Sequence, residues 1–261
     1  MKRLIKLAIS LLVRGWDVYR SGMRRLGSLQ TEGTCVVLYY HGIGPTERES
    51  FARQMDEMLR LATPVPAGLK DPLTAGGHHC AVTFDDGFVS VIENALPELE
   101  RRNIPSTVFV PTGSMGGRPA WITESSHPAH NEIVIAPSQL AALKARESVT
   151  IGSHSVSHSN FLKLDEVRVG TELSESKAVL ENVLGEPVRL FSFPHGKCDA
   201  RLVQMAKSAG YERVFTIEPG FALRHADELV SSRVSVAVDD WPLEFRLKVL
   251  GAYRWMAKAR A

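Results

Sequence analysis

The feature that most constrains the fold of this chain is an alternation of short apolar runs with longer amphipathic segments. Seven runs rich in β-branched and aromatic residues predict strands, at residues 35–40, 81–84, 107–110, 149–151, 190–193, 214–217 and 234–238. Helical patterns predict helices at residues 48–61, 89–101, 138–144, 165–184, 201–208 and 242–257. Such alternation is typical of a mostly parallel sheet with helices outside it, open or closed into a barrel. Active sites in these folds lie at the carboxyl ends of the strands.

The length and composition fit one α/β domain. A chain of 261 residues is long enough for one such domain with a large core, and its 44% hydrophobic and 23% charged residues are ordinary for a globular protein. The net charge of +2 predicts no nucleic-acid partner, because such a partner would require a local basic patch. The three cysteines have no C-x-x-C spacing and predict no disulfide framework.

Two adjacent carboxylates end the second predicted strand, in the sequence Thr-Phe-Asp-Asp-Gly at residues 83–87. Burying adjacent carboxylates is costly unless a cation or hydrogen bonds compensate for it. A metal ion is one such cation: one aspartate can bind it while the other, held nearby, acts as a base. Gly87 permits the sharp turn that directs both side chains to one place. The alternative is a solvated Asp-Asp-Gly turn.

A pair of histidines follows the fourth predicted strand, in the sequence His-Ser-Val-Ser-His at residues 154–158. At positions i and i+4 of a helical turn, two imidazoles face the same way, which suits chelation of a metal. Two neutral imidazoles and one carboxylate leave positions open for water and substrate, as in catalytic zinc sites. The alternative is a polar loop with two solvated histidines. Both pairs sit at strand ends, so the predicted fold can bring them together.

The fifth predicted strand runs into a turn, in the sequence Phe-Ser-Phe-Pro-His-Gly at residues 191–196. A rigid proline and a glycine can shape a turn that presents a backbone N–H to the oxyanion of a tetrahedral intermediate. We therefore take four residues of this turn as candidates for binding the substrate or oxyanion: Phe193, Pro194, His195 and Gly196. The alternative is an ordinary turn between a strand and a helix.

A long loop rich in Gly, Ser, Pro and His is predicted at residues 113–136. Loops of this length inside compact domains are often functional. Trp121 lies in this loop, where it can either stack on a sugar ring or simply pack on the surface. His127 and His130 are further candidates for lining a substrate cleft.

In this order, the three motifs resemble those of the polysaccharide deacetylases of the NodB-homology type, carbohydrate esterase family 4. The resemblance extends over about residues 35–238. It implies a distorted (β/α) barrel with about seven parallel strands. It also implies a divalent metal ion, usually zinc and otherwise cobalt or nickel, bound by Asp86, His154 and His158, with Asp85 as the general base. The substrates that it implies are polymers of N-acetylglucosamine or related acylated amino sugars.

The sequence departs from the family pattern in two places. Ser192 occupies the position of the arginine that steadies the catalytic base in the usual third motif, and Arg233 is the candidate replacement. The usual C-terminal Leu-x-His motif, which carries the general acid, is missing. An early strand instead ends in Tyr-His-Gly at residues 40–42, which resembles circularly permuted members that act in exopolysaccharide biosynthesis. We therefore assign the general acid to His41; the alternative is a satisfied structural histidine.

Both ends of the chain combine apolar side chains with basic ones. The N-terminal apolar run is too short to span a bilayer, and no signal-peptide cleavage pattern follows it, so we expect a basic amphipathic segment at residues 1–30. A second basic amphipathic helix is expected at residues 241–261, after a deacetylase-like domain at residues 31–240. Either end can lie on a membrane surface or pack on the domain. We expect a cytoplasmic or peripherally membrane-associated protein.

Taken together, the motifs predict a metal-dependent hydrolase that removes an acetyl group from the amide nitrogen of an amino sugar in a polysaccharide or glycan precursor. The predicted partners are an acylated amino-sugar polymer or a lipid-linked glycan. One alternative is a deacylase that acts on a lipid-linked sugar at the membrane surface, and another is a hydrolase of a non-sugar amide. A third is a catalytically inactive carbohydrate-binding relative, although such a module has no need of an unligated base like Asp85.

Overall fold

A sheet of parallel strands organises the molecule. The computed structural model describes residues 1–26 and 32–257. Its strands are β1 (Thr34–Tyr40), β2 (Thr63–Pro64), β3 (His78–Phe84), β4 (Ser106–Val110), β5 (Val149–Ser153), β6 (Leu190–Ser192), β7 (Arg213–Phe215), β8 (Val230–Ser231) and β9 (Val234–Ser235). They are hydrogen-bonded in the order β8-β7-β6-β5-β4-β3-β1-β9, with β2 paired to β3, and each pairing is parallel.

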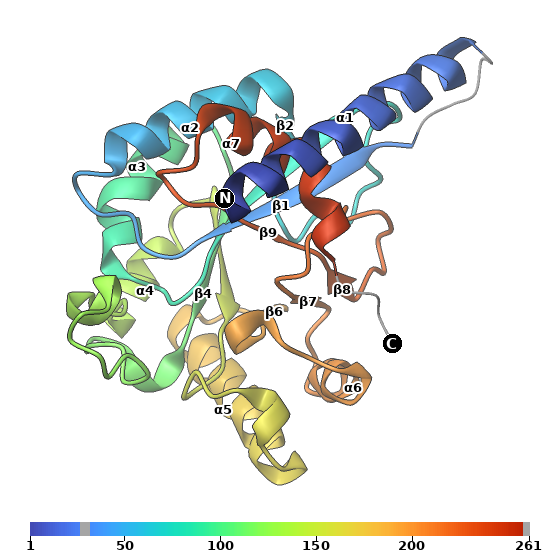
Figure 1. Ribbon diagram of the computed structural model, residues 1–261. Coiled ribbons are helices and arrows are strands. Elements are labelled where there is room, and N and C mark those ends of the chain that lie inside the picture. The colour runs from blue at the N-terminus through green and yellow to red at the C-terminus, as the bar shows by residue number, and fades with distance from the viewer. Residues whose placement is uncertain (27–31, 258–261) are drawn as a thin grey trace.

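The two edge strands of this sheet follow each other in the chain. Ser232 and Arg233 alone separate β8 from β9, yet β8 pairs with β7 at one edge and β9 pairs with β1 at the other. The sheet must therefore curl until its edges meet at these two residues (Figure 1). This arrangement confirms the predicted distorted (β/α) barrel. The structure has nine strands where seven were expected, because β2 and β8 were not predicted.

Helices surround the curled sheet on its outer side (Figure 1). They are α1 (Lys2–Leu26), α2 (Arg48–Leu61), α3 (Leu96–Glu100), α4 (Pro137–Leu143), α5 (Glu166–Leu184), α6 (Ala200–Ser208) and α7 (Pro242–Val249). Local sequence explains the ends of α5. The side chain of Asp165 accepts a hydrogen bond from the N–H of Arg168 at 2.8 Å, and Gly185 ends the helix in the left-handed conformation with φ 64°.

The barrel strands are buried on both faces, which divides the core into two layers. In β1, Val36, Leu38 and Tyr40 belong to the large apolar cluster between the sheet and the helices. Their neighbours Cys35 and Val37 belong to a smaller cluster that includes residues of β3, β4, β6 and β7. Alternate side chains of a strand point to opposite faces, so this second cluster fills the inside of the barrel.

Two predicted helices differ from the observed ones. The segment at residues 89–101 begins as a π-helix at Val91–Ala95 and continues as α3. The helix predicted at residues 242–257 ends at Val249, and a 3₁₀-helix, η6 (Ala252–Met256), follows it. Gly251 lies between them with φ 71°, a conformation that breaks an α-helix. The predicted division of the chain near residues 30 and 240 stays a prediction.

Part of the C-terminal apolar stripe faces the core, because Phe245, Leu247 and Val249 are buried. Other large apolar residues of this segment are exposed, namely Trp241, Leu243 and Trp255. Within residues 1–26 and 32–257, no helix is both long and apolar enough to cross a membrane.

The close packing of β4 against β5 gives a first testable prediction. A Cβ atom added at Gly152 would lie 2.4 Å from the Phe109 ring inside the barrel. We expect Gly152→Ala to lower the free energy of unfolding by about 1–3 kcal/mol through overpacking, measured by urea denaturation. The matched control is Gly170→Ala in α5, where an added Cβ meets no atom within 4 Å; there we expect a gain of roughly 0.5–1 kcal/mol from helix propensity. Equal effects at both positions would contradict the packing argument.

Candidate active site

Four strand ends converge on one cleft. Asp85 and Asp86 follow β3, His154 follows β5, His195 lies beyond β6, and His41 follows β1. The register pairs the last residues of β1 and β3, so the segments that follow these two strands leave the sheet side by side. The cleft has a volume of about 830 Å³. Among the sequence-predicted site residues, those that line it are His41, Asp85, Asp86, Trp121, His154, His158, His195 and Gly196.

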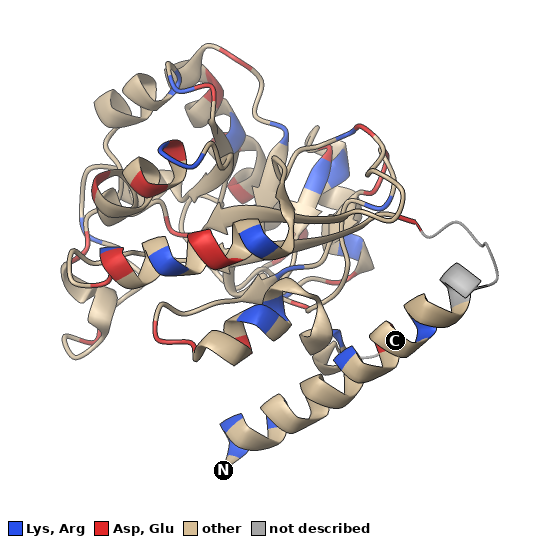
Figure 2. Ribbon diagram, turned by 90° about the horizontal axis from the view of Figure 1, so that it is seen from above, with Lys and Arg blue, Asp and Glu red and all other residues tan. Residues whose placement is uncertain are grey.

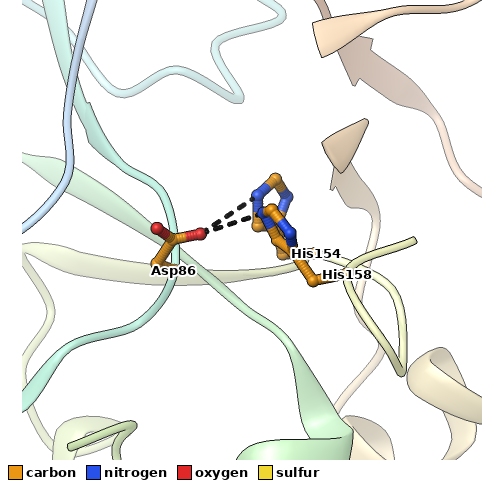
Figure 3. Close-up of side chains that lie close together, drawn as sticks. All are labelled: Asp86, His154 and His158. Carbon is orange, nitrogen blue, oxygen red and sulfur yellow. Dashed lines mark ion pairs between the residues drawn. The ribbon is translucent and has the colours of Figure 1, made fainter. Parts of the chain in front are cut away.

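The side chains of the three predicted metal ligands lie close together (Figure 3). The Nε2 atoms of His154 and His158 lie 3.6 Å and 3.2 Å from Oδ1 of Asp86, and one ligand atom from each residue lies within 4.8 Å of the others. Two ligands of a tetrahedral zinc ion, each about 2.0–2.2 Å from the metal, are roughly 3.3–3.5 Å apart. The spacing in this structure therefore fits a divalent cation.

The surroundings of the three ligands also fit a cation. Oδ1 of Asp86 is buried and has no hydrogen-bond partner within the described part of the chain. Such an oxygen is costly to bury, and a cation would compensate for it. Nδ1 of His154 lies 2.7 Å from the carbonyl oxygen of Ser192, which accepts a hydrogen bond from the Nδ1–H group and so leaves Nε2 free to bind a metal. Burial lowers the pKa of His154 to about 4, so the imidazole is neutral at pH 7.

The histidine pair lies on an irregular bend, so the prediction of a helical turn was wrong. Ser155 and His158 have φ values of 71° and 56°, which no α-helix contains. The carboxylate of Glu172, from α5, accepts hydrogen bonds from the N–H groups of Val156 and Ser157, both at 2.9 Å. It also accepts one from the Ser157 hydroxyl at 2.6 Å. These bonds hold the bend in a shape that brings both imidazoles to Asp86.

Glu172 was missed from the sequence, although a signal existed. The apolar face of α5 is buried, and Glu172 and Ser176 are polar residues on that face. A buried carboxylate requires hydrogen-bond donors, which the Ser-Val-Ser segment supplies. The polar interruption of the stripe could therefore have predicted a contact with a nearby loop, but not which loop.

Three site residues hold an unusual backbone conformation. Asp86, His158 and His195 have φ values of 68°, 56° and 58°. Residues other than glycine rarely adopt positive φ, and such residues cluster at functional sites, where the surrounding structure holds them in place. The turn predicted at Gly87 thus begins one residue earlier, at Asp86 itself.

Asp85 makes a paired contact with Arg233 inside the barrel. Nη1 of Arg233 donates to Oδ1 at 2.7 Å, and Nη2 donates to Oδ2 at 2.8 Å. Both side chains are buried, at 4% and 0% exposure. Burial alone would raise the pKa of Asp85, but the positive charge of Arg233 outweighs it and holds the pKa well below its usual range. Asp85 is therefore an ionised carboxylate that is not among the three clustered metal-ligand candidates.

The remaining donors of Arg233 are also satisfied. Its Nη2 donates to the hydroxyl of Ser192 at 2.7 Å, and its Nε donates to the carbonyl of Thr216 at 3.0 Å. Its guanidinium lies 4.7 Å from the centre of the Tyr39 ring, a distance suited to cation–π attraction. Arg233, the residue that the sequence suggested as a replacement for the missing arginine, thus contacts Asp85 from the junction of β8 and β9.

The turn after β6 offers one free amide. Pro194 has no N–H, the N–H of Phe193 donates to Phe215, and that of Gly196 donates to Phe193. Within the described residues, the N–H of His195 has no such partner, and His195 is one of the residues that line the cleft. Phe193 does not line the cleft, because its ring packs against Phe161 and Phe191 in the outer core.

Trp121 packs against one of the metal-ligand candidates, His158. Its ring stacks on that of His158, with centroids 4.4 Å apart and planes inclined by 20°. The Trp121 ring also stacks on the Phe88 ring, with centroids 6.4 Å apart. His195 contacts His158 from a different direction, edge to face at 4.9 Å. Aromatic rings therefore restrict the position of the His158 imidazole.

Comparison with known proteins identifies the family of this chain. A family model described as polysaccharide deacetylase matches residues 73–214, more than half of the chain. The chain belongs to the polysaccharide deacetylase family.

Several known proteins resemble this polysaccharide deacetylase family member. The poly-β-1,6-N-acetyl-D-glucosamine N-deacetylase of Staphylococcus aureus is 24% identical over 166 residues, which cover 60% of this chain and 54% of that protein. YxkH of Bacillus subtilis is 26% identical over 156 residues, which cover 60% of this chain and 50% of YxkH. The chain spans about half the length of these relatives. IcaB from Ammonifex degensii has the same fold, with a TM-score of 0.69, 24% identity and coverage of 85% and 98% of the two chains.

The buried ion pair in this family member gives a second prediction. Arg233→Met would leave the Asp85 carboxylate buried without its partner, so we expect the free energy of unfolding to fall by about 3–5 kcal/mol. The double variant Arg233→Met/Asp85→Asn removes that charge and should recover part of the loss. Arg189→Met is the control, because Arg189 forms an exposed ion pair with Glu212 and should cost less than about 1 kcal/mol. Urea denaturation measures all three variants; equal losses for Arg233→Met and Arg189→Met would refute the argument.

The metal-ligand geometry gives a third prediction. His154→Ala should weaken binding of zinc by more than about 100-fold, since even residues that only support a ligand contribute roughly 10- to 100-fold. Competition with a chelating dye measures the affinity, and elemental analysis measures the metal content. His127→Ala is the control, because His127 lines the same cleft outside the ligand group and should keep its metal. Full zinc occupancy in His154→Ala would exclude His154 as a ligand.

Proposed function

We propose that this chain is a metal-dependent deacetylase that hydrolyses the N-acetyl group of an amino sugar in a polysaccharide or glycan precursor. The observation that carries the proposal is the relation between two adjacent aspartates. Asp86 faces two imidazoles at metal-ligand spacing, while Asp85 is ionised, oriented by Arg233 and outside that ligand group. A site that merely held a metal would have no use for the second carboxylate.

Asp86, His154 and His158 are the residues that would hold the metal. A divalent cation there, most simply zinc with cobalt or nickel as alternatives, would polarise the acyl carbonyl and make a water molecule more acidic. Three protein ligands leave room for both water and substrate. The neutral state of His154 and the fixed orientation of its ring prepare the site for binding.

Asp85 is the general base of the proposed reaction. It accepts a proton from the attacking water as the oxygen–carbon bond forms. Its lowered pKa makes it a weak base, which suits a water molecule whose own acidity has been increased. Arg233 holds both carboxylate oxygens, so the carboxylate keeps one orientation throughout the reaction.

Two further groups complete the proposed reaction. The N–H of His195 donates a hydrogen bond to the tetrahedral oxyanion, as the amide of that turn without a backbone partner. His41 lines the same cleft, is exposed at its mouth and follows β1. It donates a proton to the amine nitrogen as the carbon–nitrogen bond breaks, and the products are acetate and a free amino sugar.

The proposed substrate rests on the relatives and the cleft. The relative from Staphylococcus aureus is named for poly-β-1,6-N-acetyl-D-glucosamine, and we propose a polymer of this chemical class here. The cleft has a volume of about 830 Å³ and is lined by the metal-ligand group. Trp121 lines it as well, although its stacking on His158 occupies one face of the ring.

A lipid-linked acylated sugar is the second candidate substrate. The observation that favours it is the cluster of exposed apolar side chains on α1, among them Leu12 and Trp16, which suits an enzyme working near a lipid surface. The substrates are distinguished by measuring acetate release from a panel of acetylated amino-sugar polymers and lipid-linked sugars. Activity that persists after complete removal of metal by a chelator would refute the proposed function.

The role of Asp85 gives a fourth prediction. We expect Asp85→Asn to lower the rate of acetate release by about 10²- to 10⁴-fold, the usual contribution of a general base. Zinc content should stay at the wild-type level, which separates loss of the base from loss of the metal or the fold. Glu124→Gln is the control, because Glu124 is an exposed carboxylate that lines the same cleft; its rate should stay close to that of the wild type. An active Asp85→Asn variant would end the assignment.

A further inference from the structure

Helix α1 docks on the domain through a stripe of polar contacts, beside which Leu7 and Val13 pack against the core. Arg3 pairs with Glu244 at 2.6 Å, Ser10 accepts a hydrogen bond from the Trp255 indole at 2.9 Å, and Asp17 accepts two from Arg254 at 2.6 Å and 2.8 Å. The three α1 residues are spaced by seven, so they lie along one face of the helix. This face is fixed to α7 and η6.

The opposite face of α1 is apolar and exposed. Nine of the seventeen large apolar side chains exposed on the described surface belong to residues 1–23. Five of them follow spacings of seven, four, three and four residues, which places them on one face: Ile5, Leu12, Trp16, Tyr19 and Met23. Leu12 is 75% exposed, and Leu4, Leu11 and Val18 form a second row beside this face. A contiguous apolar patch of this kind marks an interaction surface.

Basic side chains border this apolar face. Lys2, Lys6 and Arg20 are exposed, and they pair with no acidic group among the described residues. Asp17 is the single acidic residue in the sequence of α1, and it is engaged with Arg254 on the docked side. Figure 2 shows α1 running along the outside of the body with basic residues along its length. The exposed side of α1 therefore carries positive charge without negative charge.

We propose that the exposed face of α1 inserts into the interface of an anionic lipid bilayer, with the helix parallel to the membrane plane. Apolar side chains with a basic border are complementary to acyl chains below negatively charged headgroups. Trp16 and Tyr19 belong to the two residue types that favour the headgroup level. A second copy of this chain is a poorer partner, because a symmetric pairing of two α1 helices would bring their basic borders together. This surface is separate from the proposed active site.

The test is partition of the full chain onto phospholipid vesicles, measured by flotation. We expect binding to vesicles of phosphatidylglycerol and phosphatidylcholine, weaker binding to phosphatidylcholine alone, and weakening by salt. Leu12→Gln/Trp16→Gln should lower the partition coefficient by about ten-fold or more, because two apolar side chains no longer enter the interface. Lys2→Glu/Lys6→Glu should abolish the preference for the anionic lipid.

A matched control uses apolar residues that are exposed elsewhere. Leu162, just before α5, is 46% exposed, and Val167, on α5, is 82% exposed. Leu162→Gln/Val167→Gln should therefore bind vesicles like the wild type. Acetate release from a soluble acetylated oligosaccharide should be equal in all of these variants, and failure of that activity would concern the proposed function alone. Absence of vesicle binding by the wild type would overturn the proposal. The proposal would also be overturned if sedimentation velocity showed a dimer that Leu12→Gln/Trp16→Gln disrupts while vesicle binding is unchanged.

Discussion

The buried pair of Arg233 and Asp85 is the interaction on which the interior of this barrel depends. Two charges with almost no exposure are costly to bury, and the cost is offset because every donor of the guanidinium has an acceptor or a π-face nearby. Ser192 matters here through its size. A small hydroxyl at that position leaves space for the guanidinium of Arg233, which lies between β8 and β9, and accepts one of its hydrogen bonds. The departure from the family motif is therefore matched by a compensating residue in contact with it.

The position of Arg233 links the closure of the barrel to its chemistry. It lies where the two edges of the sheet meet, between β8 and β9, while Asp85 follows β3, which β1 separates from β9 in the strand order. Arg233 also donates hydrogen bonds to Ser192 in β6 and to Thr216, just after β7, so it contacts residues on both sides of this junction. The residue that orients the proposed general base therefore lies at the junction that closes the barrel. Arg233 and Asp85, 148 positions apart in the sequence, thus form one unit.

Some parts of this structure could be predicted from the sequence and others could not, and the physical reasons differ from part to part. The fold class and the meeting of Asp86, His154 and His158 were predictable, since alternation implies parallel strands and their carboxyl ends lie together. The bend at residues 154–158 was not, because its shape comes from Glu172 on α5 rather than from local propensity. Arg233 could be nominated as a candidate, but its contact with Asp85 depends on the order of the strands in the sheet, which no local pattern encodes. The free amide of His195 likewise emerged only when the partners of its neighbours were known.

The two ends of the chain show why amphipathicity alone does not identify what a helix binds. Both ends combine apolar and basic residues, yet α7 buries Phe245 and Leu247 in the core, while α1 turns Leu12 and Trp16 to the outside. The difference lies in which face carries the specific polar contacts. In α1, Arg3, Ser10 and Asp17 have polar partners on the domain. Leu7 and Val13 pack beside them against the core, while the other large apolar side chains of the helix are exposed. A helix fixed mainly by its polar contacts leaves most of its apolar surface available, and its basic border then selects what that surface can bind.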